Sequence, residues 1–100
     1  EMGYYIFFTS RDEGELIGYC AFFINTHPHH KTSLHATQDV LYYKKEKRGN
    51  GLRFMSYCEG ELKKRGINFM SIGVPASNDW SPILIRKGFS KLETLYVKEI

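Results

Sequence analysis

The stretch that decides the fold is LYYKKEKRGNGLR, residues 41–53. It begins with apolar and aromatic residues typical of a strand, passes through a basic segment that contains Gly49 and Gly51, and continues into apolar residues with helical spacing. A strand that enters such a loop and then a helix leaves unpaired backbone N–H groups at the positive end of the helix dipole. This arrangement predicts a binding site for phosphate groups.

The positive charge of the chain is concentrated around this loop. The chain has 14 lysines and arginines against 11 aspartates and glutamates, and the net charge of +3 is too small by itself to indicate nucleic acid. Five basic residues fall within ten positions: Lys44, Lys45, Lys47, Arg48 and Arg53. The cluster predicts an anionic ligand, because arginine in particular offers paired donors to phosphate oxygens.

The chain has the size of one domain, which we place over residues 1–100. It is 42% hydrophobic and 15% aromatic, which is enough for an apolar core. No apolar run approaches the roughly 20 residues of a membrane-spanning helix, so no membrane partner is expected. The two cysteines, Cys20 and Cys58, are too few for a secreted disulfide scaffold and favour the cytoplasm; both are expected to be buried and neither to be a nucleophile.

Before the basic loop, the pattern predicts a meander of three strands. Residues 4–9 and 16–24 are aromatic and β-branched, and the turn between them contains Gly14, which tolerates a positive φ. Residues 25–33 contain a proline and show no periodicity, so we expect a loop there. Residues 34–43 complete the meander.

After the basic loop, the apolar residues take helical spacing. Residues 52–65 predict a helix with basic residues in its last turn, which ends at Gly66. Residues 67–74 predict a strand parallel to the one before the loop, because a helix connects the two. A short helix at 79–87 and a last strand at 92–98 follow. The predicted order is β-β-β-α-β-α-β, an α/β fold with a mixed sheet.

Two motifs in this order resemble the GCN5-related N-acetyltransferase (GNAT) family in its compact bacterial and phage form. The first is a strand followed by a loop of the type Arg-Gly-x-Gly-x-Gly/Ala, similar to residues 41–43 and 48–53. The second is Val-x-x-x-Asn followed by a short helix that ends in Gly-Phe, similar to residues 74–78 and 88–89. The resemblance covers nearly the whole chain and implies the GNAT-like fold.

The resemblance implies that the parallel strands splay apart and that acetyl-CoA, as co-substrate, lies between them. It implies main-chain and phosphate contacts to the cofactor from Leu41, Tyr42, Tyr43, Arg48, Gly49, Asn50, Gly51, Leu52, Arg53 and Asn78. The backbone N–H of Tyr43 is implied as the catalytic donor to the thioester oxygen. For Asn78 an alternative is that its side chain caps the second helix.

Three features depart from the family's pattern. Arg53 stands where the last small residue of the loop is usual. Neither Leu84 nor Ile85 is the tyrosine that usually protonates the leaving thiolate, which leaves water, Tyr57, Tyr96 or no acid. The chain also starts at the family's second strand, without the preceding helices, so we expect either a fragment or an acceptor wall from a partner.

A catalytic base would assist the reaction, because an alkyl amine with a pKa of about 10.4 is only about 0.04% neutral near pH 7. Asp39, two residues before Leu41, is the first candidate. His35, four residues earlier on the same strand face, is the second, and the two could act jointly. The alternative for Asp39 is a strand carboxylate paired with a nearby lysine.

Three histidines in the expected loop, His27, His29 and His30, have a spacing that matches no common zinc site, so we expect no metal. A solvated loop is the simpler interpretation, and these side chains could instead line the acceptor site.

We therefore expect an acetyl-CoA-dependent N-acetyltransferase that acts on a primary amine of a small molecule or a protein by direct attack on the thioester. Two alternatives stay open: a CoA-binding or protein-binding domain without catalysis, and an RNA-binding module. Nucleic acid is disfavoured, because the aromatic positions of the RNA-recognition motif correspond here to Asn50 and Leu52. Exposed strand edges in so small a domain favour a homodimer.

Overall fold

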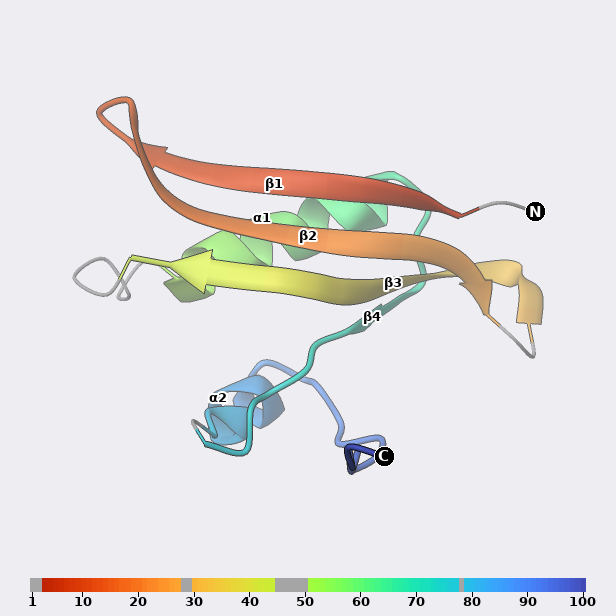
Figure 1. Ribbon diagram of the computed structural model, residues 1–100. Helices are drawn as coiled ribbons and strands as arrows, with labels where there is room; N and C mark the ends of the chain where they lie inside the picture. Colours follow the sequence, from red (N-terminus) through yellow and green to blue (C-terminus); the bar gives the residue numbers. More distant parts are fainter. Residues whose placement is uncertain (1–2, 28–29, 45–50, 78) are drawn as a thin grey trace.

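The computed structural model describes residues 3–27, 30–44, 51–77 and 79–100, which form a mixed four-stranded sheet and two helices (Figure 1). The elements are β1 (Tyr4–Asp12), β2 (Glu15–His27), β3 (His30–Tyr43), α1 (Gly51–Lys64), β4 (Phe69–Ser71) and α2 (Ser81–Arg86). The strand order is β1-β2-β3-β4, with antiparallel pairing except between β3 and β4, which are parallel. The predicted mixed sheet is confirmed.

The hairpin between β1 and β2 forms where the sequence predicts it. Its turn contains Glu13 and Gly14, both with positive φ, at 51° and 85°. The strands pair without a shift from Tyr4↔Ile24 to Ser10↔Gly18, so alternate residues of both strands share one face.

The loop predicted at residues 25–33 is wrong for most of its length. Asn25 pairs with His35, Thr26 with Leu34, and the ladder continues to His27↔His30, so β2 and β3 form a long hairpin. Polar residues are compatible with strand pairing where the sheet is open to solvent. The alternation of apolar and polar residues ends in this segment, although the backbone pairing continues.

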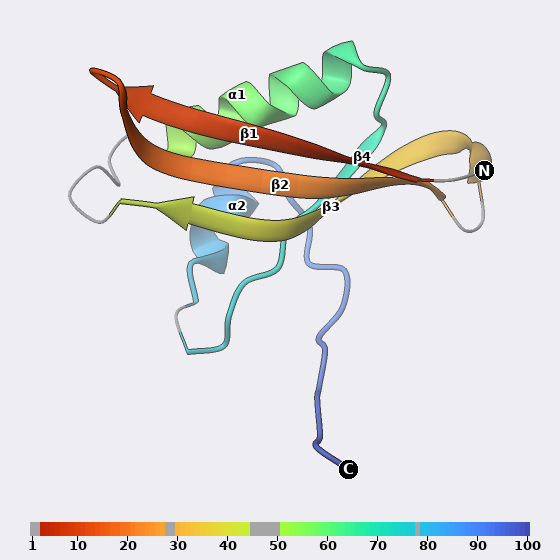
Figure 2. The same cartoon turned by 45° about the horizontal axis from the view of Figure 1, so that its top comes forward.

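The core lies between one face of the sheet and α1 (Figure 2). Phe22 and Ile24 of β2 are almost fully buried, and from α1 Cys58 and Leu62 pack into the same cluster. The helical spacing of apolar residues therefore identified the correct face, although Leu52 stays 38% exposed at the start of the helix. Gly66, with a φ of 81°, follows the last turn of α1, as predicted.

The opposite face of the sheet carries aromatic rings that remain half exposed. The Tyr5 and Phe23 rings meet edge to face with centroids 4.9 Å apart. The Tyr19 ring lies between Phe7, at 5.7 Å, and Tyr42, at 5.3 Å. These cross-strand pairs stabilise the sheet on a side that α1 does not cover.

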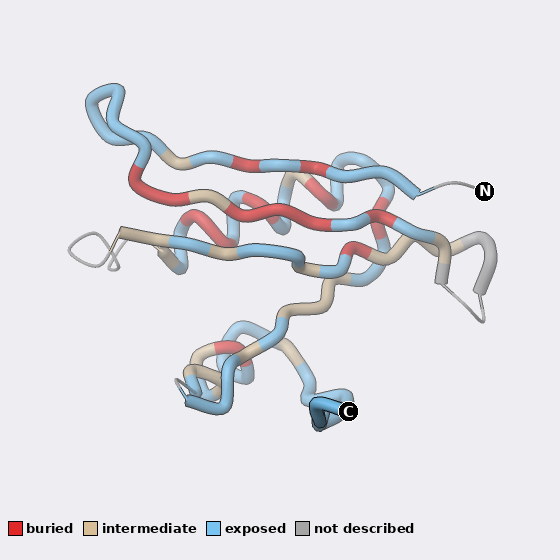
Figure 3. The backbone as a smooth tube through the Cα atoms, in the orientation of Figure 1, coloured by how far each residue is buried: buried red, intermediate tan, exposed pale blue. Residues whose placement is uncertain are grey.

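The last two predicted elements differ from the structure. The predicted helix at 79–87 is confirmed as the shorter α2, and Ser81 at its start donates its N–H to the Asp79 carboxylate at 2.9 Å. The strand predicted at 92–98 is wrong, since the chain there has no regular structure (Figure 3). Leu92 is 84% and Val97 99% exposed, because β4 is only three residues long and offers too short an edge for a further strand.

Candidate functional site

The site begins where β3 and β4 separate. The two strands pair over only three residues each, ending at Thr37↔Ser71, and the strand predicted at 67–74 is shorter for that reason. Beyond that level β3 continues to Tyr43 beside β2, while the chain after β4 turns away toward α2 (Figure 1). The Gly73 N–H donates to the Gln38 side-chain oxygen at 2.9 Å, where pairing ends. The predicted splay of the parallel strands is confirmed.

A cavity of about 400 Å³ lies between the end of β3, the first turns of α1, and α2. Its lining is mostly apolar: Leu41, Tyr43, Gly51, Leu52, Met55, Trp80 and Ile83. The size and lining fit a small-molecule site. Four residues predicted to bind the cofactor therefore come together around one cavity, although they are separated by the basic loop in the sequence.

Tyr43 forms one wall of this cavity. Its ring packs on Phe54 with centroids 5.7 Å apart, and its hydroxyl lies 3.2 Å from the Ser10 Oγ. A Cβ on Gly18 would lie 2.3 Å from the Tyr43 ring, so only glycine leaves room for the ring there. A Cβ on Gly51 would sit 3.8 Å from the same ring, in ordinary contact.

The backbone of Tyr43 is directed away from β2. Lys44 donates its N–H to the Ile17 carbonyl at 2.7 Å, and Tyr43 stands opposite Gly18. In an antiparallel ladder this pattern makes Tyr43 and Gly18 a pair without mutual hydrogen bonds. The N–H of Tyr43 consequently points to the edge of β3 that is not paired with β4 at this level. A ligand at that edge could accept a hydrogen bond from it.

Asp39 and His35 lie on β3 but belong to two separate hydrogen-bonded pairs. The Tyr5 hydroxyl donates to the Asp39 Oδ2 at 2.9 Å, and the His35 Nε2 lies 2.5 Å from the Ser71 Oγ. Asp39 stands at a register shift, since Ala21 pairs with Val40 and the next residue of β2 with Gln38. Loss of water around the phenol, followed by its hydrogen bond to Asp39, raises the pKa of Tyr5 above its ordinary value of 10.0.

The same fold occurs in solved acetyltransferases. A ribosomal-protein-alanine N-acetyltransferase from Brucella melitensis superposes with a TM-score of 0.75 at 16% identity, over 96% of this chain and 71% of the other. A GNAT family acetyltransferase from Staphylococcus aureus gives a TM-score of 0.77 at 14% identity, over 96% of this chain and 65% of the other. The chain has the fold of the GCN5-related N-acetyltransferases.

The GNAT fold is not restricted to proteins named as enzymes. A transcriptional regulator from Bacillus halodurans superposes with a TM-score of 0.80 at 16% identity, over 95% of this chain and 66% of the other. A comparison with protein-family models and one with curated proteins find no match. The chain spans about two thirds of the length of the similar solved structures, so the likeness establishes the fold alone.

Tyr42, although described, does not line the cavity between β3 and α2. Arg48, Gly49, Asn50 and Asn78 lie outside the described residues. The Tyr42 ring packs on Tyr19, on the face away from α1.

Arg53 faces a different space from the other predicted residues. It lines a second cavity with Tyr43 rather than the one between β3 and α2. Its predicted contact with the cofactor therefore stays a prediction.

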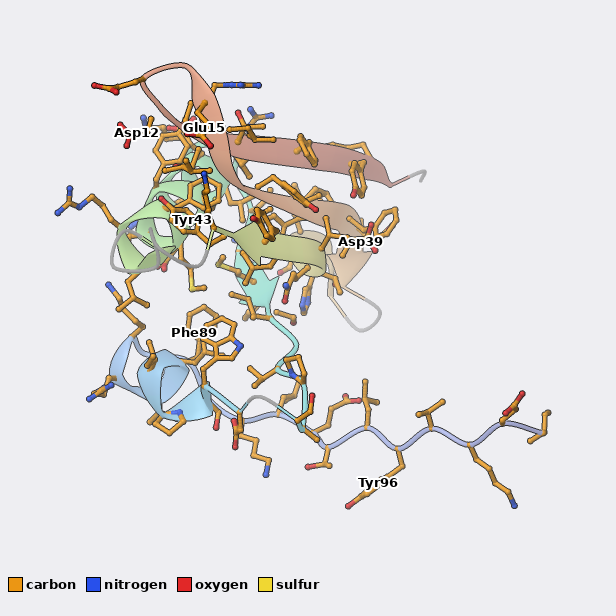
Figure 4. The ribbon with its side chains drawn as sticks, turned by 60° about the vertical axis from the view of Figure 1, so that its left-hand side comes forward. Asp12, Glu15, Asp39, Tyr43, Phe89 and Tyr96 are labelled. Atoms are coloured by element: carbon orange, nitrogen blue, oxygen red, sulfur yellow. The ribbon has the colours of Figure 1, made fainter. Side chains whose placement is uncertain are left out.

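Leu84 and Ile85, at the family's usual tyrosine position, lie apart from the two alternative tyrosines, Tyr57 and Tyr96. Leu84 is buried, Ile85 is exposed, and Tyr57 lines the second cavity. Tyr96 lies on the extended C-terminal segment, well away from Tyr43 (Figure 4). No described tyrosine other than Tyr43 borders the cavity between β3 and α2, and the Tyr43 hydroxyl is engaged with Ser10.

Sequence reasoning missed two parts of the site. Trp80 and Ile83 line the cavity from the start of α2, and the position of the chain's one tryptophan in a short helix was a usable signal. No sequence pattern indicates the hydrogen bond between Tyr5 and Asp39, because the two residues are 34 positions apart.

The described residues form neither a metal-binding cluster nor a membrane-spanning helix. No three histidine, cysteine, aspartate or glutamate side chains gather there in a way that could hold a metal ion. None of the described helices has the length and apolar character needed to span a membrane.

Proposed function

We propose that this chain is an acetyl-CoA-dependent N-acetyltransferase domain that transfers the acetyl group to a primary amine of a small molecule or a protein. The observation that carries the proposal is the separation of β3 from β4 after Thr37, beside a cavity at the start of α1. Acetyltransferases of known structure with the same fold support it.

The cavity fits the chemical parts of acetyl-CoA. Apolar side chains such as Leu41 and Met55 suit the pantetheine arm. Gly51 begins α1 without a side chain, so the first N–H groups of the helix are accessible to phosphate oxygens. Acetyl-CoA supplies a thioester, which is an acyl group already activated for attack by an amine.

Two groups of the chain suit the transfer. The Tyr43 N–H at the open edge of β3 can donate to an oxygen that gains negative charge. The Asp39 carboxylate can take the proton of the incoming ammonium group, directly or through water, and thereby offset part of the about 4.6 kcal/mol that deprotonating such an amine costs near pH 7. Both residues lie on β3 beyond Thr37, in the part of the strand that β4 no longer pairs with.

The first test is binding of acetyl-CoA by titration calorimetry. Gly51→Glu should abolish binding, because a carboxylate would occupy the helix start where the phosphates bind. Gly60→Glu is the matched control, since Gly60 lies on the same helix in open space, and it should bind like the wild type. Equal affinity of all three proteins would contradict the assignment of the cavity.

The second test is release of free CoA thiol with a panel of amines. Asp39→Asn should retain acetyl-CoA binding and slow turnover by about 10²–10⁴-fold. Loss of binding in this variant, as in Gly51→Glu, would contradict the separation of the two roles. Binding of acetyl-CoA without release of free thiol for any amine of the panel would instead identify an inactive CoA-binding domain. Binding of single-stranded RNA without binding of acetyl-CoA would identify an RNA-binding module.

A further inference from the structure

A second cavity, of about 510 Å³, lies between the end of the β1–β2 hairpin and the first turns of α1. Tyr43 lines both cavities, which share no other lining residue. Figure 4 shows Asp12 and Glu15 at the hairpin, close to Tyr43 and α1. The acyl-transfer step proposed for Asp39 and the Tyr43 N–H uses no side chain of this second cavity.

The floor of the second cavity is apolar and the rim is polar. Ile17 and Phe54 are buried beneath it, and the exposed Tyr57 ring leans on Phe8 with centroids 6.2 Å apart. The Ser10 and Tyr43 hydroxyls meet at 3.2 Å on the sheet side. A ligand that fits would have an apolar or aromatic body and a head that accepts hydrogen bonds.

Two arginines give the rim a net positive charge. Arg11 comes from β1 and Arg53 from α1, against the single carboxylate of Asp12. The Arg11 Nη1 donates to the Gly14 carbonyl at 3.3 Å, which holds this side chain at the hairpin end. The other nearby acid, Glu15, is paired with Lys44.

We propose that this cavity binds the phosphate monoester of a ligand with an apolar or aromatic body. A phosphate dianion matches two guanidinium groups in charge, and its three oxygens can accept from arginine forks and hydroxyls together. The phosphate has two possible sources: a free organic phosphate, or the phosphorylated end of a cofactor that occupies the neighbouring cavity.

The test uses phenyl phosphate as the probe, titrated into the full chain and followed by NMR chemical shifts. Wild type should bind it more tightly than it binds inorganic phosphate or benzyl alcohol, because the head and the ring contact different parts of the cavity. Arg53→Gln and Arg11→Gln should each weaken binding by about tenfold. Arg86→Gln, an exposed arginine of α2 outside the cavity, should leave it unchanged.

Phenyl phosphate affinities that are the same in wild type and in both cavity variants would overturn the proposal. Arg53→Lys guards against a folding defect, since it keeps the charge and should bind with intermediate affinity. All proteins are first compared by circular dichroism, and both Arg11 and Arg53 are exposed in the folded chain.

Competition identifies the source of the phosphate. If the phosphate belongs to the cofactor, phenyl phosphate should compete with CoA, and CoA should bind about tenfold tighter than dephospho-CoA in wild type but not in Arg53→Gln. If it belongs to a free ligand, phenyl phosphate and acetyl-CoA should bind simultaneously. Failure to bind acetyl-CoA would refute the transferase while leaving the phenyl phosphate titration interpretable.

Discussion

At the scale of single residues, Tyr43 and its glycine neighbours set the shape of the site. The Tyr43 ring fits between β2 and α1 only because Gly18 has no side chain. Its backbone N–H is turned to the open edge of β3 by the register of the β2–β3 ladder. One residue thus combines a structural side chain with a main-chain group available for chemistry.

Adding one methyl group at Gly18 should therefore be costly. In Gly18→Ala the new Cβ would meet the Tyr43 ring at 2.3 Å, and the displaced ring should lower the free energy of unfolding by about 1–3 kcal/mol. Gly60→Ala should raise it by about 1 kcal/mol, because Gly60 lies inside α1 with nothing near its missing Cβ. Urea denaturation measures both, and a stabilising Gly18→Ala would contradict the packing described for Tyr43.

The two cysteines should be inert in the folded protein. Hydrogen bonding with Cys20, and then burial, raise the pKa of Cys58 far above its ordinary value of 9.0. Because the folded state holds this proton more tightly than the unfolded state, the stability it contributes is present below about pH 9 and declines as the pH rises further. Both thiols are buried, with Cys20 4% and Cys58 1% exposed, so neither should react with a thiol reagent near pH 8 until the chain is unfolded. Rapid labelling of Cys58 in the native protein would show that the pair is accessible.

At the scale of elements, the sequence predicted what local chemistry determines. The glycine turn of the first hairpin, the apolar face of α1 and its end at Gly66 all depend on residues close in sequence, and all are confirmed. The length of β4 and the absence of a strand at 92–98 depend on whether a partner edge exists, which no local pattern reveals.

The candidate site was predictable to a similar degree. The order of strand, loop and helix brings four predicted residues to one cavity: Leu41, Tyr43, Gly51 and Leu52. The contributions of α2 to the cavity and of Tyr5 to Asp39 required the tertiary structure.

The start of α2 should respond to acid. Hydrogen bonds from the Ser81 hydroxyl and backbone N–H lower the pKa of Asp79 below its ordinary value of 3.8. A depressed pKa means that Asp79 stabilises the folded helix start above about pH 3.8 and stops doing so as the pH falls through the folded pKa. The protection factors of the α2 amides, which correct for the intrinsic exchange rate, should therefore fall at low pH, and Asp79→Ala should show that lower protection already at neutral pH. Unchanged exchange in the variant would mean that the bond to Ser81 contributes nothing.

At the scale of the whole molecule, two apolar surfaces are exposed. One is the sheet face away from α1, with Phe7 54% and Phe23 48% exposed, and the other is the C-terminal segment that runs away from the sheet (Figure 2). Exposed aromatic side chains that gather on one face of a sheet are typical of a protein interface. The predicted homodimer stays a prediction that this surface favours.

Self-association should depend on the aromatic face. Sedimentation of the chain at increasing concentration should show a dimer, and the double variant Phe7→Ser with Phe23→Ser should shift the equilibrium toward the monomer. Both side chains lie outside the core between the sheet and α1, so the fold should be retained. A wild-type chain that stays monomeric at high concentration would contradict the expectation.

The shared phenol ring of Tyr43 has a thermodynamic consequence. A ligand that displaces the ring from one cavity changes the affinity of a second ligand for the other cavity. Thermodynamic reciprocity requires the second ligand to change the affinity of the first by the same factor. Two ligands that never touch would thus sense each other's presence through a single side chain.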